Sequence, residues 1–549
     1  MNAELRAQKA RGAFFTPPQV SQFLVDWAIR GPRDVVLEPS CGDAAFLVPA
    51  AARLQQLGAI SLPNQVHGID IHAPSVVAAQ ATLAEQGLSG TVTCSDFFDI
   101  DPQRRFDAVV GNPPYVRYQD FSGAARSKSL KAALAQGVRL TSLASSWAAF
   151  TIHASSLLTD EGRLALVLPA ELLSVKYASA VRRFLLERFA KVKLILFEQL
   201  IFAGVLEEVV LVLAEGRGKS KHFEVYQSRD AEGLLKLDML AQQEFAPVDN
   251  EKWTPALIPA NALETYRQIT SAPANFAKLV DWGETYLGSV TGNNDYFTFD
   301  AEGLKAAGLR ESEVLKISPP GSRHLRGLTF TTAAWEQQVR DGGRCFLFAP
   351  SDKPSKAALA YIAKGEKSNV HKAYKCAVRD PWWRVPLVDQ PDLLFTYMNH
   401  DRPRLISNDA QALVLNSLYG VKLKKGLKSV GKSALPIACM NTVTLLGSEV
   451  VGRAYGGGLL KHEPREADLL PVPSPTILSA AQNELQLLKP QLTIAMRKND
   501  IARAVELVDE VILVKHLRLG KTEVQQLRAA REALFSRRRA RGKATRGED

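Results

Sequence analysis

The stretch DAVVGNPPYVRY (residues 107–118) decides the fold class of the first part of the chain. An apolar run ends at Gly111, and two prolines follow one residue later. Because proline has no N–H group, it cannot continue a helix or a strand ladder, and it favours extended backbone at the residue before it. We therefore expect a strand that ends in a stiff, extended loop, which carries Asn112 and Tyr115.

Other strand-like segments occur on both sides of this stretch, and helical segments separate most of them. The strand-like segments are DVVLEPS, QVHGIDI, GTVTCSDFF, FDAVVGN, RLALVLPAELL, VKLILFEQ and EEVVLVLAEG. Strands that alternate with helices at this spacing predict a parallel sheet with helices on both faces. We expect a Rossmann-like, doubly wound α/β domain over residues 1–216, with ligands bound at the carboxyl ends of its strands. Within it, residues 145–162 predict an amphipathic helix whose Trp147 and Phe150 belong to the core.

Charge is unevenly distributed along the chain. Residues 1–216 hold 20 basic and 20 acidic side chains, whereas residues 217–549 hold 48 and 37 and carry the whole net charge of +11. This excess is either a solvated basic surface or a region that meets a polyanion. The polar break EGRGKSKH (215–222) is the best candidate boundary. It leaves an α+β region at 217–475, and then a helical region with a basic, disordered tail at 476–549.

Several functional classes are disfavoured. The five cysteines are scattered and form no Cys-x-x-Cys pair, so we expect neither a zinc site nor a disulfide framework, and no metal. The N-terminus has no apolar core typical of a signal peptide, and no run of about 18 apolar residues occurs. We therefore expect a cytoplasmic protein without a membrane span.

Acidic residues stand where the first three strands end. Glu38 lies in the turn LEPSCGDAAFL, where a strand passes into a helix and backbone N–H groups can meet a ligand. Asp70 ends the second strand, where an acid can accept hydrogen bonds from ribose hydroxyls. Asp96 and Phe97 follow the third strand and suit the amino group and the face of an adenine. Each signal is weak alone, because turns need small residues and acids often cap helices.

Taken in order, these motifs resemble those of S-adenosylmethionine-dependent DNA adenine-N6 methyltransferases with an NPPY motif. The resemblance is to the gamma class, in which the cofactor motifs precede the target recognition domain, and to modification enzymes of type II restriction–modification systems. It covers residues 12–215 and begins with GAFFTPPQVSQFLVDWAI (12–29). The resemblance implies S-adenosylmethionine as cofactor, bound by Thr16, Glu38, Asp70, Asp96 and Phe97. It further implies catalysis by Asn112, Pro113 and Tyr115, and contact with the target adenine by Tyr115 and Phe202.

The chemistry of the NPPY segment agrees with this resemblance. The amino nitrogen of adenine is a poor nucleophile, because its lone pair is delocalised into the ring. The Asn112 carboxamide oxygen and the Pro113 carbonyl are two fixed acceptors for its N–H groups, and they would stabilise the positive charge that develops during transfer. Tyr115 offers a face for the base. Because a base inside a duplex cannot reach such a loop, base flipping is implied.

The second part of the chain resembles target recognition regions of the same family in pieces only, at 288–297, 399–421 and 438–473. Side chains of these loop-rich pieces suit base edges and phosphates. The lysine-rich segment KLKKGLKSVGK (422–432) suits phosphate as well. The candidate DNA contacts are Asn293, Asn294, Arg402, Arg404 and Lys461.

Three alternatives remain beside a site-specific DNA methyltransferase. The same NPPY site occurs in methyltransferases that act on protein glutamine or RNA, but the FFTPP segment and the long basic second part favour DNA. A nuclease fused to such an enzyme usually precedes the cofactor motifs, and only 15 residues precede Thr16. An inactive DNA-binding scaffold would not need the intact motif set. We expect double-stranded DNA as partner, a cognate restriction endonuclease acting separately, and a monomer.

Overall fold

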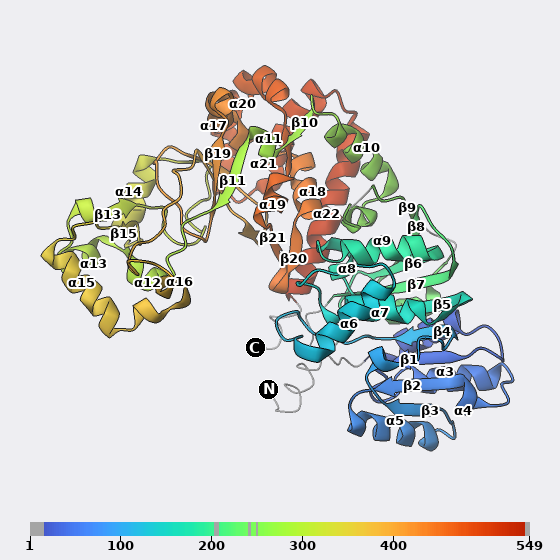
Figure 1. Cartoon of the computed structure of the whole chain (residues 1–549). Helices are drawn as coiled ribbons and strands as arrows, with labels where there is room; N and C mark the ends of the chain where they lie inside the picture. The colour runs from blue at the N-terminus through green and yellow to red at the C-terminus, as the bar shows by residue number, and fades with distance from the viewer. Residues whose placement is uncertain (1–15, 203–207, 240–242, 249–250, 544–549) are drawn as a thin grey trace. The chain divides into compact units, whose positions relative to one another are not determined.

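A computed structural model of the chain describes residues 16–202, 208–239, 243–248 and 251–543 (Figure 1). It divides into two compact units, an N-terminal unit of residues 1–257 with 540–549 and a C-terminal unit of residues 258–539. The expected boundary at 216/217 is too early, because strands β8 (Phe223–Ser228) and β9 (Gln243–Phe245) extend the sheet of the N-terminal unit. The helices after residue 475 are not a separate domain either, since α20 packs against α17 within the C-terminal unit.

The described part of the N-terminal unit is built on a nine-stranded sheet with the order β3-β2-β1-β4-β5-β7-β6-β8-β9. Strands β1 to β5 are parallel, but β7 is antiparallel to both of its neighbours, so the sheet is mixed rather than parallel throughout. The strand order reverses between β1 and β4, which is where doubly wound sheets bind ligands. The remaining strands are β1 (Val36–Pro39), β2 (Val66–Asp70), β3 (Thr91–Cys94), β4 (Phe106–Gly111), β5 (Leu158–Pro169), β6 (Phe189–Phe197) and β7 (Val209–Arg217).

Helices cover both faces of this sheet, so the expected Rossmann-like architecture is confirmed (Figure 1). Helices α2, α3 and α5 share one apolar cluster with side chains of β1, β2 and β4 to β7. Helices α7 and α9 contact β5 and β6 outside that cluster. The helices of this unit are α2 (Pro18–Ala28), α3 (Leu47–Gln56), α4 (Leu62–Gln65), α5 (Ala73–Glu85), α6 (Gly123–Ala135), α7 (Ser146–Ser156), α8 (Glu171–Ser174) and α9 (Ser179–Arg188).

Helix α7 differs from the expected amphipathic helix. Ten of its side chains are buried, from Ser146 to Ser155, so it has no solvent face. A helix that is apolar all round belongs in a core, and small residues on every side allow this close packing. Gly162 does not close the helix, because it lies inside β5.

The C-terminal unit is an α+β assembly, as expected. Its largest sheet has the order β11-β19-β16-β18-β14, formed by Gly283–Leu287, Tyr419–Leu423, Leu393–Phe395, Leu405–Asn408 and Thr329–Phe330. Smaller sheets pair β12 (Thr298–Phe299) and β13 (Val314–Lys316) with β15 (Phe346–Phe348), β17 (Met398–Asn399) and β20 (Arg453–Tyr455) with β21 (Leu459–Lys461), and β10 (Phe276–Lys278) with β22 (Pro471–Pro473). Residues 296–385 have an apolar cluster that Leu415 completes.

Helices fill the rest of the C-terminal unit and differ in length from expectation. In the region expected to be helical after residue 475, α20 continues through Pro490, and residues 536–543 are the end of α22 rather than a disordered tail. The helices are α10 (Ala260–Ser271), α11 (Leu279–Trp282), α12 (Asn294–Phe297), α13 (Ala301–Ala306), α14 (Thr332–Arg340), α15 (Lys356–Lys367), α16 (Tyr374–Ala377), α17 (Lys428–Ala438), α18 (Thr442–Val451), α19 (Pro464–Asp468), α20 (Pro475–Arg497), α21 (Ile501–Asp509) and α22 (Lys521–Lys543).

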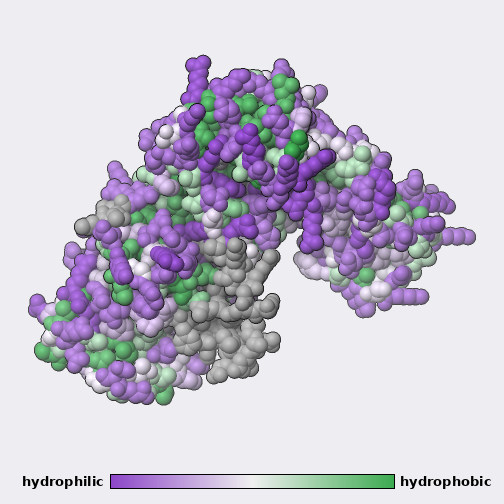
Figure 2. All heavy atoms as spheres, turned by 180° about the vertical axis from the view of Figure 1, so that it is seen from behind, coloured by the Kyte–Doolittle hydropathy of each residue, from purple (hydrophilic) through white to green (hydrophobic). Residues whose placement is uncertain are grey.

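Charged and polar side chains cover much of the face shown in Figure 2, with apolar residues scattered among them. Within the described ranges, no single helix is long and apolar enough to cross a membrane. The segments Lys425–Ala438 and Thr442–Val451 pass that test only as a pair, on length and composition, with an 89° bend between them.

Candidate active site

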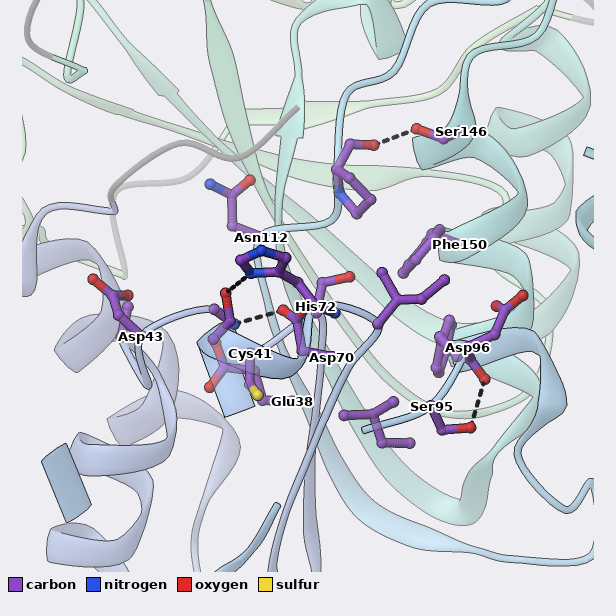
Figure 3. Close-up of a pocket in the computed structure, with 18 of the residues that line it drawn as sticks. Glu38, Cys41, Asp43, Asp70, His72, Ser95, Asp96, Asn112, Ser146 and Phe150 are labelled. Atoms are coloured by element: carbon purple, nitrogen blue, oxygen red, sulfur yellow. Dashed lines mark hydrogen bonds between the residues drawn. The ribbon is translucent and has the colours of Figure 1, made fainter. Parts of the chain in front are cut away.

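A cavity of about 670 Å³ opens where strands β1 to β4 end in the N-terminal unit. Because the carboxyl ends of parallel strands meet at one edge of a sheet, the four loops that follow them converge there. In Figure 3, Asn112 and Ser146 lie on one side of the cavity, and Glu38 and Asp70 lie on the other. Of the residues proposed from the sequence, the cavity wall includes Thr16, Glu38, Asp70, Asp96, Phe97 and Asn112.

The turn after β1 forms one wall of the cavity with unusual backbone angles. Ser40, Gly42 and Ala44 have positive φ values of 63°, 52° and 73°. Residues other than glycine rarely adopt this backbone conformation, and it persists only where the surrounding structure enforces it. The turn aims the Gly42 N–H at the cavity edge, where it donates to Asp70 Oδ2 at 2.9 Å.

Glu38 is a buried carboxyl in this wall. Its side chain is 2% exposed, and among the described residues its Oε2 atom has no hydrogen-bond partner. Burial raises the pKa of Glu38 well above its ordinary value, against hydrogen bonds from the backbone of Leu47 and Phe46. An unsatisfied buried carboxylate oxygen costs free energy, and a cationic or N–H-bearing ligand would remove that cost.

Asp70 holds the end of β2 together. Its Oδ2 atom accepts from Gly42, and its Oδ1 atom accepts from the His72 N–H at 2.8 Å. Ile71, between them, lines the cavity with 73% of its side chain exposed. The end of β2 therefore presents a carboxylate next to an open aliphatic face, a pairing that suits a ribose and the ring attached to it.

Asp96 and Phe97 form the opposite end of the cavity, after β3. Asp96 Oδ1 accepts from the Phe98 N–H at 3.0 Å, and its Oδ2 pairs with Lys128 Nζ at 3.3 Å. The ring of Phe97 stacks on Phe150, with centroids 4.9 Å apart and planes at 28°. Both rings line the cavity, so Phe150 is a wall residue as well as a core residue, whereas Trp147 is fully buried.

Asn112 faces the cavity from the loop after β4. Its amide N–H donates to Thr16 Oγ1 at 3.2 Å, which fixes the orientation of the carboxamide. Its Oδ1 atom is buried and has no hydrogen-bond partner within the part of the chain that the structure describes. A fixed, buried acceptor without a donor is what an incoming amino group requires.

Ser146, at the start of α7, holds the loop in place and was not foreseen. Its hydroxyl donates to the Pro114 carbonyl and accepts from the Val116 N–H at 2.9 Å, while its own N–H donates to the Val116 carbonyl at 3.0 Å. The loop thus has three hydrogen bonds to one residue, 30 positions along the chain. A helix N-terminus rich in serine was the sequence signal, but it did not reveal which loop Ser146 contacts.

The other proposed catalytic residues lie beside the cavity rather than in its wall. Among the described residues, the wall contains Pro114 and Val116 but neither Pro113, which is buried, nor Tyr115. The Tyr115 hydroxyl donates to the Val167 carbonyl of β5 at 3.0 Å, and its half-buried ring packs against the apolar core. Phe202 is 4% exposed in the same core, and its contact with a target base stays a prediction.

The candidate DNA contacts of the C-terminal unit are largely engaged in internal contacts. Arg402 and Arg404 are 5% and 6% exposed, and Arg404 Nη2 donates to both carboxylate oxygens of Asp401, at 2.9 and 2.8 Å. Burial, followed by the nearby charge of Arg404, lowers the pKa of Arg402 to about 10. These two arginines are therefore not surface side chains in this structure, and their contact with DNA stays a prediction.

The remaining three candidates also have local partners. Asn293 caps α12 by accepting from the Tyr296 N–H at 3.0 Å, and Asn294 Oδ1 accepts from the Thr291 hydroxyl at 2.6 Å. Lys461 Nζ pairs with Glu463 at 2.9 Å. In the described ranges, no group of three or more His, Cys, Asp or Glu side chains is arranged to hold a metal ion.

Two family models match the chain. The model described as N-6 DNA Methylase matches residues 1–284, and that described as Type II methyltransferase M.Eco57I, C-terminal domain, matches residues 250–513. The chain is 23% identical over 471 residues to the type II methyltransferase M.AccI of Acinetobacter calcoaceticus, covering 84% of this chain and 85% of the relative. It is 24% identical over 490 residues to M.XamI of Xanthomonas campestris pv. amaranthicola, covering 85% and 86%.

A solved structure of the type IIL restriction-modification enzyme MmeI in complex with DNA shares the fold. The TM-score is 0.53 at 12% identity, over 94% of this chain and 75% of that one. At this identity the likeness concerns the fold alone, but it extends over both units. Because the N-6 DNA methylase model matches more than half of the chain, the chain belongs to the N-6 DNA methylase family and is an adenine-specific DNA methyltransferase.

Proposed function

We propose that the chain transfers the methyl group of S-adenosylmethionine to N6 of an adenine flipped out of duplex DNA, at the cavity where β1 to β4 end. We also propose that it is the modification enzyme of a type II restriction–modification system. The unpartnered Asn112 Oδ1 at the cavity carries the first proposal. The names of the two relatives, each aligned over more than four fifths of both chains, support the second.

The cavity residues fit the cofactor. S-adenosylmethionine supplies a methyl group on a positively charged sulfur, next to an adenosine and an amino-acid group. Asp70 would accept from the ribose hydroxyls beside Ile71, and Phe97 with Phe150 offers an aromatic wall for the adenine ring. The unpartnered Glu38 oxygen, in the turn that the resemblance assigns to the methionine moiety, would face positive charge.

Asn112 is proposed to act directly on the target amine. Its Oδ1 would accept one N–H of the adenine amino group, and the Pro113 carbonyl would accept the other. Two acceptors favour a pyramidal nitrogen with a localised lone pair, and they stabilise the positive charge that appears as the new bond forms. Because Thr16 and the prolines already fix the acceptors, little reorganisation is needed at the moment of transfer.

Tyr115 is proposed to hold the ring of the flipped base. Its hydroxyl is anchored to Val167, so the ring has one defined position next to Asn112. Stacking on an aromatic side chain contributes about 1–3 kcal/mol per base. Stacking in this position requires the base to leave the duplex, and that step costs the energy of unstacking and unpairing.

The test is transfer of labelled methyl groups to competing acceptors. Purified full-length protein is incubated with tritiated S-adenosylmethionine and plasmid DNA, ribosomal RNA or total cell protein. We expect label in DNA only, and at a limited number of restriction fragments, because a modification enzyme acts at specific sites. Label in RNA or protein but not in DNA would overturn the proposed substrate. Label spread evenly over all fragments would overturn site specificity.

A further inference from the structure

The segment 356–384 of the C-terminal unit carries an excess of positive charge, with seven Lys and Arg residues against two acidic ones. It comprises α15, a 3₁₀ turn (Val370–Lys372) and α16, and each of these contacts the next. Exposed side chains gather at their junction. We call this junction the lysine corner and define it as Lys364, Lys367, Lys372, Tyr374 and Lys375.

The cations of the lysine corner are not neutralised within the unit. Across the residues described, none of its four lysines forms an ion pair, whereas Lys428, Lys432 and Lys461 all do. Charged side chains on a surface are usually only solvated, and unpaired lysines alone would support nothing more. Four unpaired lysines within twelve residues, next to an exposed aromatic ring, are more typical of a binding surface.

Tyr374 is that ring. Its side chain is 76% exposed, and Lys375 Nζ lies 5.4 Å from its centroid. Tyrosine and lysine are both side chains that bond the phosphate and sugar groups of DNA. Its exposure contrasts with the aromatic residues of the neighbouring core, such as Phe297 and Phe348, which are fully buried.

The lysine corner packs against the loop that carries Asn293 and Asn294, two of the candidate DNA contacts. Arg379 donates to the carbonyls of Thr291, at 2.8 Å, and Val290, at 2.5 Å, and the Cys376 thiol lies 3.7 Å from the same Thr291 oxygen. Gly292 has φ of +87°, and a side chain there would meet Lys375 Cβ at 3.0 Å. The loop with Asn293 and Asn294 is therefore fixed beside Lys375.

We propose that the lysine corner binds the phosphate backbone of duplex DNA and thereby places the 290–295 loop at the bases. Charge complementarity identifies the partner, because duplex DNA presents closely spaced phosphates and four unpaired cations stand ready to replace its counterions. Phosphate contacts set register without reading sequence. The side chains of Arg402 and Arg404, two of the candidate DNA contacts, are instead used internally. The inference rests on DNA being the substrate.

The test is the salt dependence of DNA binding by full-length protein. The double variant Lys372→Gln/Lys375→Gln is compared with the control variant Lys305→Gln/Lys356→Gln. The control removes two exposed lysines of the same unit that lie outside the lysine corner. Lys356 begins α15, and the adjacent Ala357 lies close to Gly308, two residues after the end of α13. Fluorescence anisotropy measures the affinity for two unrelated duplexes between about 50 and 200 mM salt.

Loss of two phosphate contacts is expected to reduce the slope of log affinity against log salt by about 1.8, equally on both duplexes. The control double variant is expected to retain the wild-type slope, and both are expected to unfold at the wild-type temperature. Tyr374→Ala is expected to weaken binding of both duplexes, with Tyr374→Phe intermediate. An unchanged slope in Lys372→Gln/Lys375→Gln, or the same loss in the control, overturns the inference.

A loss of affinity for only one of the two duplexes would indicate that these lysines read bases. That result would also overturn the proposal that they bind phosphates. The outcome is separate from that of the proposed function. If wild-type protein labels no DNA, the proposed substrate fails. If wild-type protein labels DNA while the lysine variants bind DNA like wild type, only the inference about the lysine corner fails.

Discussion

The cavity of the N-terminal unit and the lysine corner of the C-terminal unit are built on opposite principles. The cavity contains buried acceptors, Glu38 Oε2 and Asn112 Oδ1, and backbone turns hold it in shape. The lysine corner exposes its cations to water. A site that selects one atom must exclude water and fix its dipoles, whereas a site that meets a repeating charge needs only exposed counter-charge. Single substitutions should therefore have large effects in the cavity and small, additive effects at the corner.

The largest effect is expected for Asn112→Ala. Removing one preorganised group that stabilises transition-state charge lowers the rate by about 100- to 1,000-fold. Affinity for S-adenosylmethionine should stay within a few-fold, because Asn112 is not proposed to bind the cofactor. Single-turnover transfer and calorimetric titration measure the two quantities. Asn112→Asp keeps an acceptor oxygen and should retain more activity than Asn112→Ala. Loss of cofactor binding with an unchanged rate at saturation would contradict this role.

Arg404→Ala is expected to lower stability rather than change DNA binding specifically. Removing one partner of a buried ion pair costs about 3–5 kcal/mol, but the Asp401 side chain is 38% exposed, so we expect about 1–3 kcal/mol. Urea unfolding measures the change, with Lys305→Gln as an exposed control. A stable variant with a reduced salt slope would show that Arg404 reaches DNA, and it would remove the contrast with the lysine corner.

Ser146→Ala is expected to slow transfer moderately. The substitution removes two side-chain hydrogen bonds that hold Pro114 and Val116, each contributing about 0.5–1.5 kcal/mol. The loop should become less well placed, so we expect about a 3- to 10-fold lower rate, with cofactor affinity retained. Ser146→Thr keeps the hydroxyl and should recover part of the rate. Equal losses in Ser146→Ala and Ser146→Thr would indicate crowding in α7 instead of loss of the hydroxyl.

The smallest effect is the pH dependence that Glu38 adds to stability. Burial raises its pKa in the folded state, so between its ordinary and raised pKa the folded protein binds more protons than the unfolded chain. The free energy of unfolding therefore falls as pH rises through that window. Glu38→Gln stays neutral and should lack this component. The melting temperature of the cofactor-free variant, minus that of wild type, should increase with pH. A difference that is constant with pH would show that Glu38 is ionised throughout.

The residues of the cavity could be predicted from the sequence because the strand topology determines their positions. Glu38, Asp70, Asp96 and Asn112 each lie at or just after the end of a strand, and parallel strands of one sheet bring their carboxyl ends together whatever the loops contain. Ser146 was missed, since its partners are set by the way α7 packs rather than by a strand end. The boundary was placed too early because β8 and β9 follow a polar, glycine-containing turn that is typical of a linker.

The C-terminal unit was less predictable because its loops pack by tertiary contacts. Arg404 and Lys375 both lie in polar, basic segments, and nothing local distinguishes the buried side chain from the exposed one. Asp401, three residues before Arg404, was the available signal of an internal pair. Uniform burial of α7 was also unforeseen, because Thr151 and Ser155 bond back to helix carbonyls and so need no solvent.

The identity of the methylated nucleoside shows directly which amine the cavity accepts. The exocyclic amines of adenine and cytosine would both satisfy two fixed acceptors, so the acceptors alone do not name the base. DNA methylated by wild-type protein with isotopically labelled S-adenosylmethionine is digested to nucleosides and analysed by mass spectrometry. We expect all label in N6-methyladenine, and almost none with Asn112→Ala. Label in N4-methylcytosine or 5-methylcytosine, or wild-type yield from Asn112→Ala, would contradict this expectation.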